Sequence, residues 1–356
     1  MRTVKTVAMV MLILLTATAG VFAGGGQEAR AERQELVVYS TIFAGYAEAM
    51  KEEFEARNPG VTVQVINPGG TEAMVSRLRA EANNPRADVV HSGGSSTYQV
   101  MKNDGLLQAA NLGNIGIPAE IPLGAGMLPT RDPENYFFSW AILFSGFMIN
   151  TDQMQQLGLP VPTSYADLAD PIYNGHVISP NPLLSSTAVT NVMAVVQAYG
   201  EERAWDLWEE IDANIGFYSD STSNTYNLVA RGEYPIAIVV NRPVYELQLQ
   251  GYPVEFVIPR DGTMVQDNAM GVVNGAQNKE LAERFIAFIL SEDMQRIGAD
   301  FPYTPVRPGV LDPDSFISLD NLAADINVLL LPDAELEAAV RPRRQEHFET
   351  MMRRRQ

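Results

Sequence analysis

The sequence predicts an α/β fold with two lobes, each a mixed sheet flanked by helices, and a ligand cleft between them. Short apolar runs rich in β-branched residues alternate with stretches of helical periodicity, a pattern typical of mostly parallel sheets covered by helices. The chain has 356 residues, 46% of them hydrophobic, a length that suggests about two domains. A long apolar stretch near residue 140 interrupts the alternation, which then resumes.

The first half of the chain opens with an expected strand at residues 35–40 (ELVVYS). A helix follows, and the sequence 58–60 (NPG) ends it. Strands are expected at 61–66 and 87–91, with a helix between them and another beginning near Ser96. The apolar stripe of the first helix has helical spacing and consists of Phe43, Ala47, Met50 and Phe54.

The middle of the chain is marked by residues 137–150 (FFSWAILFSGFMIN). This stretch is too long for one typical strand and too interrupted for a membrane helix. We interpret it as an extended connection plus a strand that leads into a second lobe. Beyond it we expect strands at 177–179, 236–240, 254–258 and 270–273, and helices at 187–199, 202–213 and 279–290. Core residues of the second of these helices are expected to be Trp205, Trp208 and Ile211.

These elements predict a division of the chain that crosses between the lobes more than once. The first lobe is expected to contain residues 35–135 and 262–300, and the second lobe residues 136–261 and 301–340. Residues 341–356 are rich in arginine and are interpreted as a solvated terminal helix, for which a charged tail without function is the preferred explanation.

The N-terminus has the features of an export signal. Arg2 and Lys5 precede a short apolar run, and cleavage is expected after Ala23, with residues 24–34 as a flexible leader. The alternative is an uncleaved anchor, but the run is shorter than the roughly 20 residues that span a bilayer. We therefore expect a periplasmic protein with no membrane insertion after cleavage.

Charge and cysteine content exclude several classes of function. The formal net charge is −18, and an acidic surface repels nucleic acids and anionic headgroups. One locally positive cleft can still hold an anion. The chain has no cysteine, which excludes disulfides, cysteine-ligated metals, thiol nucleophiles and a lipid-modified cysteine. We expect no cofactor and no metal, and a protein that is not a lipoprotein.

Hydroxyl and small residues recur where an expected strand ends and a helix begins. Helix N-termini carry free N–H groups and partial positive charge, and ligands of open α/β sheets bind beyond the carboxyl ends of strands. Ser and Thr are also good helix caps, so each loop alone is explained by capping. The five loops together favour a ligand site; they are 40–41, 69–71, 93–96, 185–187 and 221–225.

Arg242 directly follows the expected strand at 236–240, where its guanidinium can clamp a carboxylate or phosphate. A surface ion pair is the alternative. His91 is interpreted as a core histidine rather than a ligand donor. Tyr39, Tyr226 and Tyr303 are candidates for lining the cleft, and packing is the expected role of Tyr303. The full set of expected ligand-binding residues is Ser40, Thr41, Thr71, Gly94, Ser95, Ser186, Thr187, Thr225, Tyr226 and Arg242.

Motifs of common enzyme classes are absent from the sequence. It contains no G-x-S-x-G elbow, no P-loop and no H-E-x-x-H pair. We therefore expect no catalytic residues and no enzymatic activity, with a secreted enzyme as a remaining alternative.

Several segments resemble the ferric-ion-binding branch of periplasmic solute-binding proteins, whose relatives bind iron, thiamine, phosphonates or sugar phosphates. The resemblance covers residues 35–307. Its segments include LVVYST, EAMVSRLRAEANNPRADVV, NDGLLQ, INTDQM, PTSYADLADPIYNGHVISPNPLLSST, LVARGEYPIAIVV and QNKELAERFIAFILSEDMQ. It implies the type II-like periplasmic binding protein fold, a monomer that closes by a hinge, and import through an ABC permease and ATPase.

The iron ligands of that branch do not carry over to this sequence. Where the iron proteins have an adjacent tyrosine pair, this chain has Arg242 and Pro243. Gly93 stands where they have an acidic ligand, and a position near Phe43 replaces an early histidine. Ferric iron prefers anionic oxygen ligands, which an arginine does not supply. We therefore expect a small anionic solute, such as an organophosphate or phosphonate. A ferric iron or iron–anion receptor using Tyr226 and Tyr303 is the alternative.

Overall fold

The structure is a computed structural model. It describes residues 34–123, 126–315, 317–319, 327–329 and 334–354. The expected signal peptide, and the leader up to residue 33, lie outside these residues.

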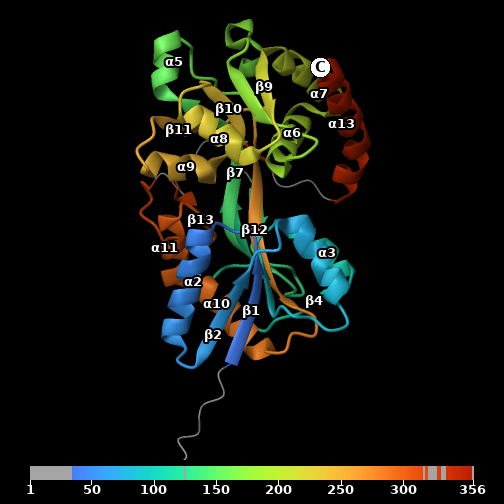
Figure 1. Cartoon of the computed structure of the whole chain (residues 1–356), viewed down its shortest axis with the longest axis vertical. Coiled ribbons are helices and arrows are strands. Elements are labelled where there is room, and N and C mark those ends of the chain that lie inside the picture. Colours follow the sequence, from blue (N-terminus) through green and yellow to red (C-terminus); the bar gives the residue numbers. More distant parts are fainter. Residues whose placement is uncertain (1–33, 124–125, 316, 320–326, 330–333, 355–356) are drawn as a thin grey trace, which may run out of the picture.

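Two long antiparallel strands run through the centre of the molecule and join two sheets (Figure 1). They are β7 (Phe138–Asn150) and β12 (Thr263–Val273). The strand order is β2-β1-β3-β12-β7-β10-β8-β9. We call the part around β1–β3 the first lobe and the part around β8–β10 the second lobe.

The first lobe places helices on both faces of its sheet. On one face, α2 and α10 pack in a core that contains Met50, Phe54 and Phe285. On the other face, α3 and α4 pack in a core that contains Met74 and Tyr98. The sheet is formed by β1 (Gln34–Ser40), β2 (Val61–Ile66), β3 (Val89–His91), β4 (Leu107–Gln108) and β13 (Thr304–Pro305) with β7 and β12; a separate hairpin is β5 (Glu120–Leu123) and β6 (Gly126–Pro129). The helices are α2 (Ala44–Arg57), α3 (Thr71–Glu81), α4 (Ser95–Asn103), α10 (Lys279–Ile289) and α11 (Glu292–Asp300).

The second lobe repeats this layered arrangement. One face of its sheet is covered by α6 and α7, whose Trp205, Trp208 and Ile211 are buried as the sequence predicts. The opposite face is covered by α8 and α9. The remaining strands are β8 (Val177–Pro180), β9 (Ile215–Ser219), β10 (Ile236–Val240), β11 (Val254–Val257) and β14 (Val328–Leu329). The helices are α5 (Thr151–Leu157), η1 (Ala166–Ala169), η2 (Pro171–Tyr173), α6 (Ser186–Tyr199), α7 (Glu201–Asn214), α8 (Thr222–Ala230), α9 (Asn241–Leu249) and α13 (Ala334–Arg354).

Two of the expected strand boundaries are wrong. Residues 138–150 form one strand of 13 residues rather than a connection and a strand. The expected return strand at 270–273 is the end of β12, which has 11 residues. Both strands are long because each pairs in the two lobes in turn: β7 pairs with β12 at its start and with β10 at its end. A periodicity window cannot detect a strand that crosses from one sheet to another.

Two C-terminal expectations are also corrected. We placed residues 301–340 in the second lobe, but Tyr303, Val306 and Ile317 pack in the first-lobe core because β13 pairs with β7 at Ala141 and Ile142. The end of the chain is helical, because residues 341–354 belong to α13, but this helix is not solvated on all sides. The Phe348 and Met351 side chains in this helix are buried, and α13 packs against α7, where the Phe348 ring meets Trp208 edge-on at 5.9 Å.

In the part of the chain that the structure describes, no helix combines the length and the apolar character that crossing a bilayer requires.

Candidate functional site

The loops that follow β1 and β3 lie side by side because these strands pair in parallel, with Ser40 opposite His91. The Ser40 hydroxyl is 3.2 Å from His91 Nδ1 and is buried. The Thr41 amide donates to Ser92 Oγ at 3.2 Å, and the Thr41 and Ser92 hydroxyls are in hydrogen-bond contact. The parallel register thus brings the hydroxyl groups of Ser40, Thr41 and Ser92 together at the carboxyl ends of β1 and β3.

The loop after β3 has an unusual backbone that the sequence does not reveal. Ser92 has a φ of 109° and Gly93 a φ of 90°, a left-handed region that side chains rarely adopt. A Cβ on Gly93 would lie 2.9 Å from the Thr71 Cγ2 atom. The glycine therefore lets the start of α3 approach this loop, which brings Thr71 next to Gly93. Non-glycine residues with positive φ occur preferentially at functional sites.

The N-terminus of α4 is already occupied by a carboxylate. The Ser95 amide donates to Asp267 Oδ1 at 2.9 Å, and the Ser139 hydroxyl donates to Asp267 Oδ2 at 2.5 Å. Burial raises the pKa of Asp267, and these hydrogen bonds oppose the shift. Gly94 is the N-cap of the helix. Ser95 is therefore engaged with β12, a contact that the sequence analysis did not anticipate.

The His91 ring, at the last residue of β3, is completely buried, as the sequence analysis expected of a core histidine. It stacks on Trp140 with 4.7 Å between ring centroids, and burial lowers the pKa of His91 to about 3. Tyr39, one of the tyrosines considered for the cleft, is also buried and donates to Glu81 Oε2 at 2.8 Å. Both side chains belong to the interior of the first lobe.

The N-termini of two helices meet in the second lobe. The Ser185 hydroxyl caps α6 and is 2.8 Å from the Thr222 hydroxyl at the start of α8. The Asn191 amide group donates to Thr187 O at 2.9 Å and to Val239 O at 3.0 Å, which ties α6 to the end of β10. Ser186 begins α6, so the Asn191 side chain connects the first turn of this helix to the end of β10.

Thr225 and Tyr226 are held inside the second lobe. The Thr225 hydroxyl donates to Ser221 O at 3.3 Å within α8. The Tyr226 hydroxyl donates to Val240 O at 3.1 Å and accepts from the Val240 amide at 3.2 Å. Both side chains are buried. These bonds fasten α8 to the last residue of β10, two positions before Arg242.

Arg242 is the most unusual charged residue of the site. Its side chain is buried, with 9% of the residue exposed. The Nη1 atom forms an ion pair with Glu246 at 3.0 Å, one helical turn further along α9. Among the described residues, Nε and Nη2 have no hydrogen-bond partner although both are buried. These two atoms form one edge of the guanidinium, which has the geometry for a bidentate contact with an oxyanion.

The guanidinium of Arg242 reaches across to the first lobe. Its central carbon lies 5.0 Å from the Phe43 ring centroid and 4.7 Å from the Tyr303 ring centroid. The sequence analysis considered Tyr303 for the cleft but expected it to pack, and it did not consider Phe43 as a contact of the site. It left open whether Arg242 forms a surface ion pair. The ion pair with Glu246 exists, but it is largely buried; the i, i+4 spacing of Arg242 and Glu246 was its available signal. Nothing in the local sequence connects Arg242 to either ring.

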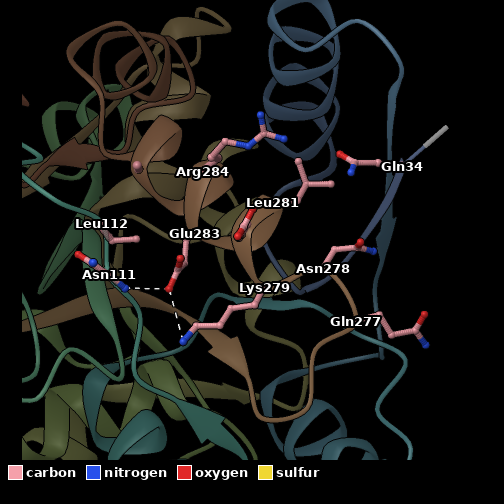
Figure 2. Close-up of a pocket in the computed structure, with 11 residues that line it drawn as sticks. Gln34, Asn111, Leu112, Gln277, Asn278, Lys279, Leu281, Glu283 and Arg284 are labelled. Atoms are coloured by element: carbon pink, nitrogen blue, oxygen red, sulfur yellow. Dashed lines mark hydrogen bonds and ion pairs between the residues drawn. The ribbon is translucent and has the colours of Figure 1, made fainter. Parts of the chain in front are cut away.

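A separate hollow of about 740 Å³ lies beside α10 (Figure 2). Gln34 lines it, at the amino end of β1, whereas ligands of α/β sheets bind at carboxyl ends. Its Glu283 accepts from the Asn111 amide at 2.8 Å and lies 3.7 Å from Lys279 Nζ. We do not assign the ligand site here. Across the described residues, no cluster of three or more His, Asp or Glu is arranged to hold a metal ion.

Comparison with known proteins identifies relatives over most of the chain. An uncharacterized protein of Haemophilus influenzae is 29% identical over 284 residues, 78% of each chain. Iron uptake protein A1 of Synechocystis is 27% identical over 325 residues, 84% of this chain and 83% of that protein. These relatives are consistent with the resemblance to periplasmic solute-binding proteins.

A solved structure gives the same fold. The periplasmic binding protein AfuA of Actinobacillus pleuropneumoniae, with fructose-6-phosphate bound, superposes with a TM-score of 0.69 and 26% identity. The match covers 83% of this chain and 91% of that one, so the predicted two-lobed fold class is confirmed. Residues 84–321 match the model of a family described as bacterial extracellular solute-binding protein. The protein therefore belongs to the bacterial extracellular solute-binding protein family.

Proposed function

We propose that this protein is the periplasmic receptor of an ABC importer and captures a small anionic solute between its lobes. The observation that carries the proposal is the unpaired edge of Arg242. Leaving a buried donor without a partner costs about 1–3 kcal/mol, and more for a charged group. An oxyanion on Nε and Nη2 would remove that cost and supply charge-assisted hydrogen bonds of roughly 1.5–3 kcal/mol each.

The surrounding groups support an oxyanion at this place. The hydroxyls of Ser185 and Thr222 meet at the N-termini of α6 and α8, and helix N-termini attract anions. Thr41 and Thr71 bring hydroxyls from the first lobe. We assign Ser40, Thr225 and Tyr226 to positioning because their side chains are buried and hydrogen-bonded within the protein, and Ser95 because its amide is held by Asp267.

The known relatives suggest which anions to test. The AfuA structure contains fructose-6-phosphate, a phosphate ester whose terminal oxygens fit a bidentate guanidinium. A cationic Arg242 disfavours naked ferric iron by charge repulsion, whereas an iron–anion complex such as ferric citrate presents carboxylates. We therefore favour a phosphate ester or phosphonate as the imported solute.

The decisive experiment is calorimetry on the wild-type protein and on two arginine variants. Fructose 6-phosphate, inorganic phosphate, a phosphonate, a dicarboxylate, ferric citrate and thiamine are titrated in turn. We expect Arg242→Ala to weaken the best anion by at least ~30-fold, equivalent to about 2 kcal/mol. Arg242→Lys retains the charge but loses the bidentate edge, so we expect an intermediate loss.

Arg231→Ala is the matched control, because Arg231 is an exposed arginine paired with Glu233 near the start of β10. We expect this control to leave the affinity unchanged. Unaltered anion affinity in Arg242→Ala would refute the assignment. A purple-red colour on adding ferric iron would favour the iron receptor, and turnover of a bound solute would favour an enzyme.

A further inference from the structure

Arg242 is part of a contact between the two lobes as well as a candidate ligand donor. The residue stands at the start of α9 in the second lobe, while Phe43 and Tyr303 belong to the first lobe. The two rings lie 5.0 Å and 4.7 Å from the guanidinium carbon, distances typical of cation–π contacts. Figure 1 shows α9 directly above α2 and β13, the elements that Phe43 and Tyr303 adjoin.

The first-lobe side of this contact is held in place by its surroundings. The Phe43 amide donates to the Tyr303 hydroxyl at 3.4 Å, which keeps the two residues together. Tyr303 packs against Trp140 at 4.7 Å and Tyr46 at 5.3 Å. A Cβ on Gly45 would lie 2.7 Å from a Phe43 ring carbon, so the glycine leaves room for the ring. Both residues are thus held in place by neighbours within the first lobe.

The second-lobe side keeps two donors unpaired. The guanidinium lies over both rings and its Nη1 pairs with Glu246, while Nε and Nη2 are buried and have no partner among the residues that the structure describes. Lobe contact without an oxyanion therefore carries a desolvation cost, and an oxyanion on that edge removes it. Binding of the anion and formation of the aromatic contact then favour each other.

We propose that Arg242, Phe43 and Tyr303 form an interlobe latch, in which a cation–π contact stabilises the closed arrangement and the bound anion strengthens it. The part played by the anion rests on the proposed function. In this scheme Phe43 and Tyr303 are positioning residues. They raise the affinity for the solute by stabilising closure, without donating a hydrogen bond to it.

The latch can be tested by measuring the distance between the lobes. The chain contains no cysteine, so spin labels can be attached specifically after Glu52→Cys on α2 and Gln248→Cys on α9, both exposed positions. Pulsed electron–electron double resonance then gives the distance distribution between the two labels. The doubly labelled protein without further substitutions is the parent, and it is measured without ligand and with fructose 6-phosphate or inorganic phosphate. We expect Phe43→Ala to shift the distribution to longer distances and to weaken the anion about 5- to 10-fold.

Two variants separate the latch from general packing. Phe43→Leu keeps apolar bulk but removes the ring face, and we expect it to behave like Phe43→Ala. Phe217→Ala is the matched control, because Phe217 is 41% exposed and Phe43 is 42% exposed, yet Phe217 lies on β9. We expect this control to change neither the distances nor the affinity, with thermal unfolding confirming that all variants fold.

The outcomes distinguish the latch from the proposed function. Unchanged distances and affinity in Phe43→Ala would overturn the latch, even if Arg242→Ala abolished anion binding. If no anion binds the parent but Phe43→Ala still lengthens the ligand-free distance, the cation–π latch stands and the anion-receptor proposal fails. If Phe43→Leu retains the parent's distances and affinity, the contact is apolar packing and the cation–π proposal is wrong.

Discussion

The chemistry of single residues in this site depends on burial more than on residue type. Arg242 and His91 both carry groups that titrate or bear charge, and both are withdrawn from water. Arg242 retains a partner on one side in Glu246, and its other edge is the one that we propose binds the solute. The hydrogen-bond partner of His91 is the neutral Ser40 hydroxyl, and its ring is buried against Trp140. Burial therefore favours the neutral imidazole.

His91 predicts a specific pH dependence of stability. Burial lowers the pKa of His91 to about 3 from an ordinary value of 6.5. Between these values the unfolded chain binds a proton that the folded chain does not, so stability falls as pH drops from 6.5 toward 3. We expect His91→Gln to flatten the decline of Tm between about pH 6 and 4, where the histidine contributes on the order of 1 kcal/mol per pH unit. Thermal melts across this range check it; a constant offset at every pH would contradict the prediction.

At the scale of elements, the candidate site depends on loops that allow helices to approach one another. The loop after β3 is the clearest case, since its left-handed Gly93 lets the start of α3 come close. Equivalent contacts in the second lobe rely on side-chain hydroxyls, as between Ser185 and Thr222. The contact between the loop after β3 and the start of α3 is therefore expected to be sensitive to the addition of a single methyl group.

Gly93→Ala tests this sensitivity. The substitution forces an alanine into a positive φ and brings its Cβ to 2.9 Å from Thr71, so we expect a loss of about 2–3 kcal/mol in the free energy of unfolding. Gly105→Ala is the control for backbone strain alone, because Gly105 has a φ of 70° and open space around it; we expect a loss of about 1–2 kcal/mol. Thr71→Ser removes the opposing methyl and should partly rescue Gly93→Ala in denaturant titrations. Equal losses for both glycines would show that the approach of Thr71 is unimportant.

At the scale of the whole molecule, the two lobes have separate cores joined by β7 and β12. Phe285 is buried in the first-lobe core, whereas Phe348 of α13 is buried in the second. The strands β7 and β12 are shared by both lobes, and Tyr245 of α9 also packs in the first-lobe core. This arrangement is suited to hinge closure.

The separate cores predict local effects of core substitutions. We expect Phe285→Ala and Phe348→Ala each to cost about 3–5 kcal/mol, because each removes a fully buried ring. Hydrogen exchange followed by mass spectrometry should show faster exchange mainly in the first lobe for Phe285→Ala and mainly in the second lobe for Phe348→Ala. Acceleration spread evenly over both lobes in either variant would indicate one cooperative unit instead.

Most strands and helices, and the importance of Arg242, could be predicted from the sequence. The partners of the other candidate residues could not. The strand at residues 236–240 and the helix containing Trp205 and Trp208 were predicted because their apolar periodicity is local. Arg242 was identified because it follows such a strand. Ser95 and Tyr226 were expected to face a ligand, yet their partners are Asp267 and Val240, which only the fold brings close. Apart from the corrected segment 301–340, the lobe boundaries stay predictions, and so do the ligand contacts.

The sequence by itself determined the alternation of strands and helices, the hydroxyl-bearing helix starts and the position of one arginine after a strand. Each of these depends on neighbours within a few residues. Only the tertiary structure decided that β7 is one continuous strand, that α13 packs on the second lobe, and that Arg242 contacts the rings of Phe43 and Tyr303 while Nε and Nη2 have no hydrogen-bond partner among the described residues. The reason is physical: burial and cation–π contact depend on which distant segments meet, and local periodicity contains no information about that meeting.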